Sequence, residues 1–99
     1  MSKPVYLYFC MLGFTEAWYQ LSKEEQDNLF LKVADIDKRA GAKVLIMCNS
    51  RWADEATVAW GVEEFPDMDA YQKTVEESEK LNWNRYVSSK TILGTKMEE

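Results

Sequence analysis

Residues 4–12 have the sequence Pro-Val-Tyr-Leu-Tyr-Phe-Cys-Met-Leu, and this run decides the fold more than any other part of the chain. In an extended segment its residues alternate between two sets, Val5, Leu7, Phe9 and Met11 on one side and Tyr6, Tyr8, Cys10 and Leu12 on the other. Both sets are apolar or aromatic, which is typical of a central strand that is covered on both faces. We therefore expect residues 4–12 to form a central strand of a sheet.

The next regular segment is a helix predicted for residues 22–40. Ser22 and Glu25 have the spacing of a capping box, in which each side chain accepts a hydrogen bond from the other residue's backbone amide. Gly41 is suited to the left-handed conformation that ends many helices. Four apolar residues share one helical face, with Phe30 at its margin: Leu29, Val33, Ile36 and Ala40. Leu31 points away from that face.

The rest of the chain completes a βαββαβ order. Residues 42–51 form a second apolar strand, residues 52–55 a turn, and residues 56–65 a third strand that returns antiparallel to the second. Asp67 is a plausible N-cap for a helix that extends to about Lys80, and residues 85–97 have the mixed polarity of an edge strand. The fold class is α+β and ferredoxin-like, with a four-stranded antiparallel sheet in the order four-one-three-two and two helices on one face.

Composition limits both the size and the partners of the protein. With 99 residues, 46% of them hydrophobic, the chain suits one domain over residues 1–99. The net charge is −5 and no run of Lys or Arg occurs, so we expect neither a nucleic-acid nor a membrane partner. No segment has the length of a membrane span, and the apolar start suits a strand better than a signal peptide, so a cytoplasmic protein is expected.

Histidine is absent, and this excludes several kinds of chemistry within the chain. Without histidine there is no Ser-His-Asp triad, no His-ligated haem and no His-ligated zinc site. The two cysteines, Cys10 and Cys48, each lie in an apolar strand, and we expect both to remain thiols because the third strand separates their strands. No cofactor and no metal site is predicted.

The sheet needs a second cover. Two helices cover one face of a four-stranded sheet, yet the first two strands are apolar on both sides, and a two-fold pairing with a second copy buries the remaining face. This pattern, together with Phe65-Pro66-Asp67-Met68-Asp69-Ala70-Tyr71 at the strand-to-helix junction, resembles the dimeric α/β barrel superfamily. That superfamily includes antibiotic-biosynthesis monooxygenases, EthD-like proteins and stress-responsive A/B barrel proteins. The resemblance implies a homodimer or a higher homo-oligomer.

The resemblance also implies a small aromatic or polyketide-like ligand, held in the barrel lumen or between the sheet and the helices. The candidate ligand-binding residues are Tyr6, Tyr8, Trp18, Tyr19, Met47, Trp60 and Glu63. The alternative, that these aromatic residues pack the core or the dimer interface, remains open. Glu63 or its neighbour Glu64 could act as a general base if its carboxyl group is buried, and only one of them can point inward because adjacent strand residues face opposite sides.

Cofactor-free monooxygenases of this superfamily resemble the chain in their use of Asn, Trp, Tyr and Arg to hold a phenolic substrate. By that resemblance the candidate catalytic residues are Asn49, Trp52, Arg85 and Tyr86. Asn would orient a phenol oxygen, Trp would stack on the ring, and Arg would stabilise a phenolate.

Two functions follow from these observations. The first is a small-molecule-binding barrel protein that acts as a cofactor-independent monooxygenase on an aromatic or polyketide-like compound. The second is a non-catalytic barrel protein that serves assembly or stress protection. A real pocket with polar lining favours the first function, and a space filled by side chains favours the second.

Overall fold

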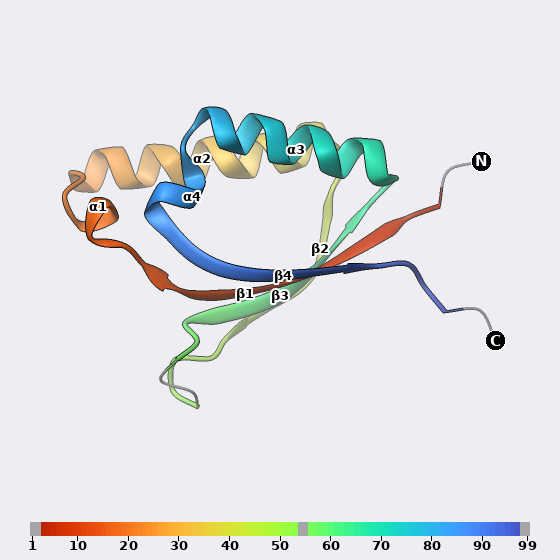
Figure 1. Ribbon diagram of the computed structural model, residues 1–99, viewed down its shortest axis with the longest axis horizontal. Coiled ribbons are helices and arrows are strands. Elements are labelled where there is room, and N and C mark those ends of the chain that lie inside the picture. The colour runs from red at the N-terminus through yellow and green to blue at the C-terminus, as the bar shows by residue number, and fades with distance from the viewer. Residues whose placement is uncertain (1–2, 54–55, 98–99) are drawn as a thin grey trace.

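The computed structural model describes residues 3–53 and 56–97, and these contain four strands and four helices (Figure 1). The strands are β1 (Val5–Phe14), β2 (Lys43–Asn49), β3 (Ala59–Phe65) and β4 (Val87–Gly94). The longer helices are α2 (Lys23–Arg39) and α3 (Met68–Lys80), and the two short ones are α1 (Glu16–Tyr19) and α4 (Trp83–Tyr86). The predicted turn at 52–55 lies partly outside the described residues, since 54 and 55 are not described.

All strand pairs are antiparallel and the sheet has the order β2-β3-β1-β4, which confirms the predicted fold class and strand order. The register places Cys10 of β1 opposite Trp60 of β3, and Trp60 opposite Cys48 of β2. One complete strand therefore separates the two cysteines, and both are free thiols as predicted.

The helix ends are formed as the sequence predicts. The Ser22 hydroxyl accepts a hydrogen bond from the Glu25 amide at 3.1 Å, and the Glu25 carboxylate accepts one from the Ser22 amide at 3.0 Å. These bonds, the backbone one first, hold the pKa of Glu25 below its ordinary value. Gly41 has a φ of 81°, and Asp67 caps α3 by accepting from the Ala70 amide at 2.8 Å.

The start of the last strand differs from the prediction. Arg85 and Tyr86 do not open β4 but belong to α4, the single helical turn before it. Asn82 takes a left-handed conformation with a φ of 57°, and this bend lets the Arg85 amide donate back to the Asn82 carbonyl at 2.9 Å. The Thr15 hydroxyl then donates to the Arg85 carbonyl at 2.6 Å. The turn is thus fixed by a residue some seventy positions earlier, which local patterns do not show.

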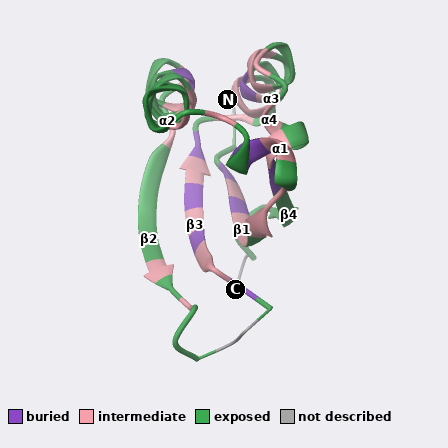
Figure 2. Ribbon diagram, turned by 90° about the vertical axis from the view of Figure 1, so that its left-hand side faces the viewer, coloured by how far each residue is buried: buried purple, intermediate pink, exposed green. Residues whose placement is uncertain are grey.

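The helices all lie on one side of the sheet (Figure 1). Figure 2 shows α2 on the side of β2 and α3 on the side of β1 and β4, with the buried residues concentrated in β1 and β3. The core residues include Val5, Leu7, Ile36, Phe65 and Val87. The edge strand β2 is apolar but exposed, so the opposite, open face of the sheet and this edge have no cover within the described chain.

Candidate functional site

A cleft of about 510 Å³ lies between the sheet and the helices, and we call it the sheet–helix cleft. Its floor consists of the helix-facing side chains of all four strands, and its walls come from α2, α3 and α4. The described lining residues are Leu7, Phe9, Met11, Phe30, Val33, Ala34, Asp37, Met47, Glu63, Phe65, Tyr71, Thr74, Val75, Ser78, Trp83, Asn84, Val87, Ser89 and Thr91. A mostly apolar cleft of this size with a few polar groups is typical of small-molecule sites.

One stripe of α2 forms a wall of the cleft, and its members are Phe30, Val33, Ala34 and Asp37. The intervals of three, four and seven residues place them on one helical face. The predicted apolar stripe is the less exposed face of α2, since Ile36 is buried and Leu29, Val33 and Ala40 are half-buried. Ile36 and Ala40 also line a groove that α2 shares with α3. Leu31 is 68% exposed and points away from the core, as predicted.

Two carboxyl groups meet inside the cleft, Asp37 from α2 and Glu63 from β3. They interact through a hydrogen bond as well as through charge. Only 9% of the Glu63 surface is exposed, and its Oε2 atom is buried without a hydrogen-bond partner among the described residues. A buried polar atom without a partner costs stability, so its persistence in a cleft needs an explanation.

Burial also changes the protonation of this carboxyl pair. Desolvation, the charge of Asp37 and their hydrogen bond together raise the pKa of Glu63 to about 7, and desolvation is the largest of the three causes. Desolvation raises the pKa of Asp37 to about 6, while the hydrogen bond from Glu63 opposes that increase. The pair therefore exchanges a proton near neutral pH, with Glu63 as the hydrogen-bond donor and Asp37 as the acceptor.

Aromatic rings close one end of the cleft. Phe30 and Trp83 line it with ring centroids 5.8 Å apart, and both contact Trp18 edge to face. Trp18 is buried and stacks on Phe14 at 4.7 Å, so it supports this wall from behind. Of the two α1 residues predicted to bind ligand, Trp18 is a packing residue of this cluster and Tyr19 is 68% exposed.

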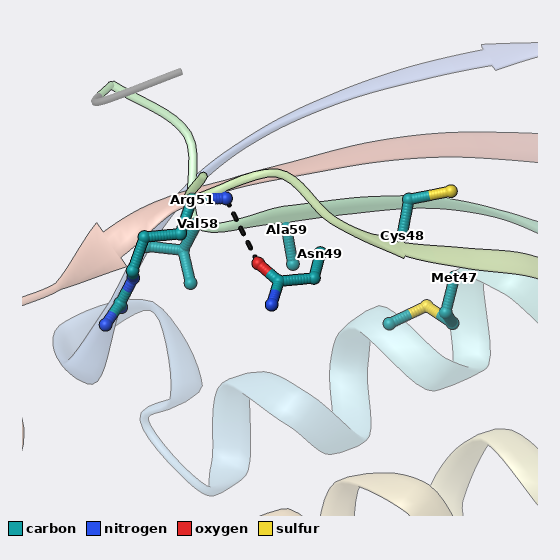
Figure 3. A pocket seen from close by; sticks show the side chains of 6 residues that line it. All are labelled: Met47, Cys48, Asn49, Arg51, Val58 and Ala59. Carbon is teal, nitrogen blue, oxygen red and sulfur yellow. Dashed lines mark hydrogen bonds between the residues drawn. The ribbon is translucent and has the colours of Figure 1, made fainter. Parts of the chain in front are cut away.

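Asn49 lies elsewhere, at the end of β2, in a shallow pocket (Figure 3). Met47, Cys48, Asn49, Arg51, Val58 and Ala59 line that pocket. The Asn49 side-chain oxygen accepts a hydrogen bond from the Arg51 amide at 3.1 Å, which keeps its carbonyl group on the local backbone (Figure 3). Trp52, Arg85 and Tyr86 are not among the described residues that line this pocket.

The other three candidate catalytic residues are spread over two parts of the fold. Trp52 follows β2 and is 85% exposed, whereas Arg85 and Tyr86 lie on α4, next to β4 at the opposite edge of the sheet. The structure thus does not bring the four together in the pocket that holds Asn49. The physical reason is the strand order, which places β3 and β1 between β2 and β4.

The remaining candidate ligand-binding residues divide between the two faces of the sheet. Met47 and Glu63 line the sheet–helix cleft, whereas Tyr6, Tyr8 and Trp60 lie on the open face. Tyr8 and Trp60 are neighbours there with ring centroids 6.0 Å apart, and the Tyr8 hydroxyl is 3.3 Å from the Cys10 sulfur. Hydrogen bonding to that thiol, above all, raises the pKa of Tyr8.

Sequence reasoning missed Asp37. A carboxylate in an acidic helix is ordinarily interpreted as a solvated residue. The available signal was its position seven residues after Phe30 and four after Val33, on the face that also carries Ala34. Among the described residues, no group of three or more His, Cys, Asp or Glu side chains is placed to hold a metal ion. None of the described helices combines the length and the apolar character needed to cross a membrane.

Comparison with solved structures shows the fold. The chain is similar to a protein of unknown function from Rhodopseudomonas palustris, RPA0582, with a TM-score of 0.71 and 13% identity over 100% of this chain and 86% of that one. It is also similar to SnoaB, a cofactor-independent oxygenase from Streptomyces nogalater, with a TM-score of 0.54 and 12% identity over 100% of this chain and 97% of that one. At the level of sequence, neither a family model nor a curated protein matches the chain.

Proposed function

We propose that this chain is a cofactor-independent monooxygenase that binds a small aromatic or polyketide-like compound in the sheet–helix cleft. The observation that carries the proposal is the cleft itself, which holds a titratable carboxyl pair between an apolar floor and an aromatic wall. An oxygenase that uses no cofactor has the same overall fold, and this likeness supports the proposal at the level of the fold.

The proposed reaction requires few functional groups from the protein. An activated methylene group that has lost a proton reacts directly with dioxygen, and the overall reaction turns the methylene into a carbonyl group and releases one molecule of water. Dioxygen is the oxidant and the substrate carbon supplies the electrons, so no separate reductant is needed. The protein has to bind the ring, orient it and stabilise the anion.

The cleft has side chains for these tasks. Phe30 and Trp83 present ring faces and edges against which an aromatic ligand can pack. Thr74 and Ser78 of α3 and Thr91 of β4 add hydroxyl groups to the lining, although the Thr74 hydroxyl already donates to the Tyr71 carbonyl at 2.6 Å. The aromatic end wall and these scattered hydroxyls suit a flat, oxygenated ligand.

Dioxygen consumption tests the proposal. The protein is incubated in air with dithranol, a dihydroxyanthrone, while an electrode follows dioxygen and absorbance follows the quinone product. We expect consumption that is proportional to protein concentration and equal to the quinone formed. Controls are the same solution without protein and with protein unfolded by heat. Equal rates in all three solutions contradict the oxygenase and favour the non-catalytic alternative.

We further propose that two copies pair through the open face of the sheet. That face carries Tyr8, Val62 and Ile92, an apolar set on a surface that the described helices leave uncovered. Burial of such an apolar face against the same face of a second copy is favourable and produces a two-fold dimer. The pairing leaves the sheet–helix cleft on the other side of each sheet, so one copy contains a complete cleft.

A further inference from the structure

We propose that Glu63 and Asp37 form a proton relay that removes the proton of an acidic C–H or O–H group on the ligand in the sheet–helix cleft. The inference deepens the proposed function and rests on it for the identity of the ligand. It assigns a substrate class, namely phenols and methylene groups activated by neighbouring carbonyl or aryl groups.

The geometry gives the two carboxyls different positions in the relay. Glu63 projects from the floor of the cleft, and its Oε2 atom is buried with no bonding partner in the part of the chain that the structure describes. Its carboxyl also shares a hydrogen bond with Asp37 on α2. Glu63 therefore has one interaction that is satisfied by the protein and one acceptor atom left for a ligand.

The proton balance follows from this arrangement. Near neutral pH, Glu63 donates its own proton to the Asp37 carboxylate, and Oε2 accepts a hydrogen bond from the ligand. As the ligand's C–H or O–H bond breaks, its proton moves to Oε2 and the proton that Glu63 held moves to Asp37. The ligand gains the negative charge that Asp37 loses, and Glu63 stays neutral throughout. No charge is created in the cleft, which keeps the desolvation cost of the transfer low.

The surroundings do not suggest an ion pair as the reason for this buried carboxyl pair. None of the described residues that line the cleft is a Lys or an Arg, whether it comes from α2, α3, α4 or one of the four strands. The other titratable side chain of the lining is Tyr71 on α3, whose ring packs edge to face against Phe65 at 5.3 Å. A purely structural pair would be expected to have all of its oxygens bonded or to be paired with a cation.

Hydrogen–deuterium exchange without dioxygen tests the relay separately from oxygenation. The protein and dithranol are mixed in deuterium oxide under argon, and proton NMR follows the loss of the methylene signal. We expect the wild-type protein to accelerate this exchange, and Glu63→Gln to lower the acceleration by about 100-fold or more. Glu64→Gln is the matched control, because Glu64 is the next residue of β3 and lies on the open face. It should exchange dithranol at the wild-type rate.

Asp37→Asn supplies a signature that a structural role would not produce. Removing the charge of Asp37 lowers the pKa of Glu63, because that charge and the shared hydrogen bond both raise it. A Glu63 that acted alone would therefore keep its activity, with the acid side of the pH–exchange profile moved to lower pH. The relay predicts instead that a folded Asp37→Asn variant loses about as much of the acceleration as Glu63→Gln, because the Asn amide does not take up the proton that Glu63 gives up. This measurement is independent of Glu63→Gln should that variant fail to fold.

The outcomes separate the two proposals. Exchange that needs Glu63, together with no dioxygen consumption in air, refutes the oxygenase and supports the relay. Dioxygen consumption with equal exchange rates in the wild type and a folded Glu63→Gln variant overturns the relay and leaves the oxygenase. No acceleration of exchange by the wild type, or an acceleration that is retained in a folded Asp37→Asn variant, also overturns the relay.

Discussion

Glu63 and Glu64 are neighbours on β3, and their carboxyl groups lie in opposite environments. The side chain of Glu63 is buried in the sheet–helix cleft beside Asp37, whereas that of Glu64 lies on the open face and accepts a hydrogen bond from the Tyr6 hydroxyl at 2.9 Å. That bond is the main cause of the raised pKa of Tyr6. The strand alternation thus supplies two matched carboxylates, one in the candidate site and one outside it.

The first prediction concerns stability and pH. The pKa of Glu63 rises from 4.5 to about 7 on folding, and that of Asp37 from 3.8 to about 6. Between about pH 4 and pH 7 the folded protein therefore holds protons that the unfolded chain has released, so stability falls as pH rises through this window and levels off above it. The loss should be on the order of 2–3 kcal/mol. Urea titrations at pH 5 and pH 8 measure it.

The control for that measurement is again the neighbouring pair of variants. Glu63→Gln should lose less stability than the wild type between the two pH values, because this variant lacks one of the two carboxyl groups whose pKa is raised. Glu64→Gln should lose as much as the wild type. A wild-type protein that is equally stable at pH 5 and pH 8 would show that the carboxyl pair titrates normally.

The second prediction concerns Gly61, which lies next to the cleft floor between two strands. A Cβ atom added there would meet the Ile46 carbonyl oxygen at 2.6 Å, the Met47 sulfur at 2.7 Å and the Phe9 ring at 2.9 Å. The backbone oxygen cannot move without disturbing the β2–β3 pairing, so Gly61→Ala should destabilise the protein by about 1–3 kcal/mol. The control is Gly94→Ala, since a Cβ at Gly94 meets nothing within 4 Å among the described residues. Equal midpoints of thermal unfolding for both variants would contradict the register of β2 against β3.

The third prediction tests the proposed pairing. Ile92 is 54% exposed and lies on the open face opposite Tyr8, so Ile92→Glu would place a charge in the middle of the paired surface. Sedimentation velocity at micromolar concentration should show a dimer for the wild type and a monomer for this variant. Leu31→Glu is the control, because Leu31 is equally apolar and 68% exposed but lies on the outer side of α2. A monomeric wild type would refute the pairing, and dissociation by Leu31→Glu alone would move the interface to the helices.

Much of the fold could be predicted because its signals are local. The alternation in residues 4–12 indicates a strand, Ser22 and Glu25 form the capping box that their spacing predicts, and the strand order follows from the βαββαβ plan. α4 could not be predicted, since it depends on the contact between Thr15 and Arg85.

The candidate site was harder to predict than the fold for the same physical reason. Glu63 was a candidate because a strand can bury only one of two adjacent glutamates. Asp37 could not be identified from the sequence, because the role of its carboxylate depends on its contact with Glu63, which lies on another element. The grouping of Asn49 with Arg85 relied on a resemblance, and the sheet places them at opposite edges.

The last prediction decides between the sheet–helix cleft and the pocket at the end of β2 as the ligand site. Ala34 lines the cleft on the same face of α2 as Asp37, so Ala34→Phe would place a ring in the space that a ligand needs. We expect this variant to weaken the binding of dithranol by at least about 10-fold, which corresponds to about 1.4 kcal/mol. Asn49→Ala should leave binding unchanged, because Asn49 lines the other pocket and its oxygen bonds the Arg51 amide. Binding is followed by the change in dithranol absorbance under argon, and circular dichroism confirms that both variants are folded. The reverse result, with binding lost in Asn49→Ala and retained in Ala34→Phe, would place the ligand at the end of β2 and remove the carboxyl pair from the site.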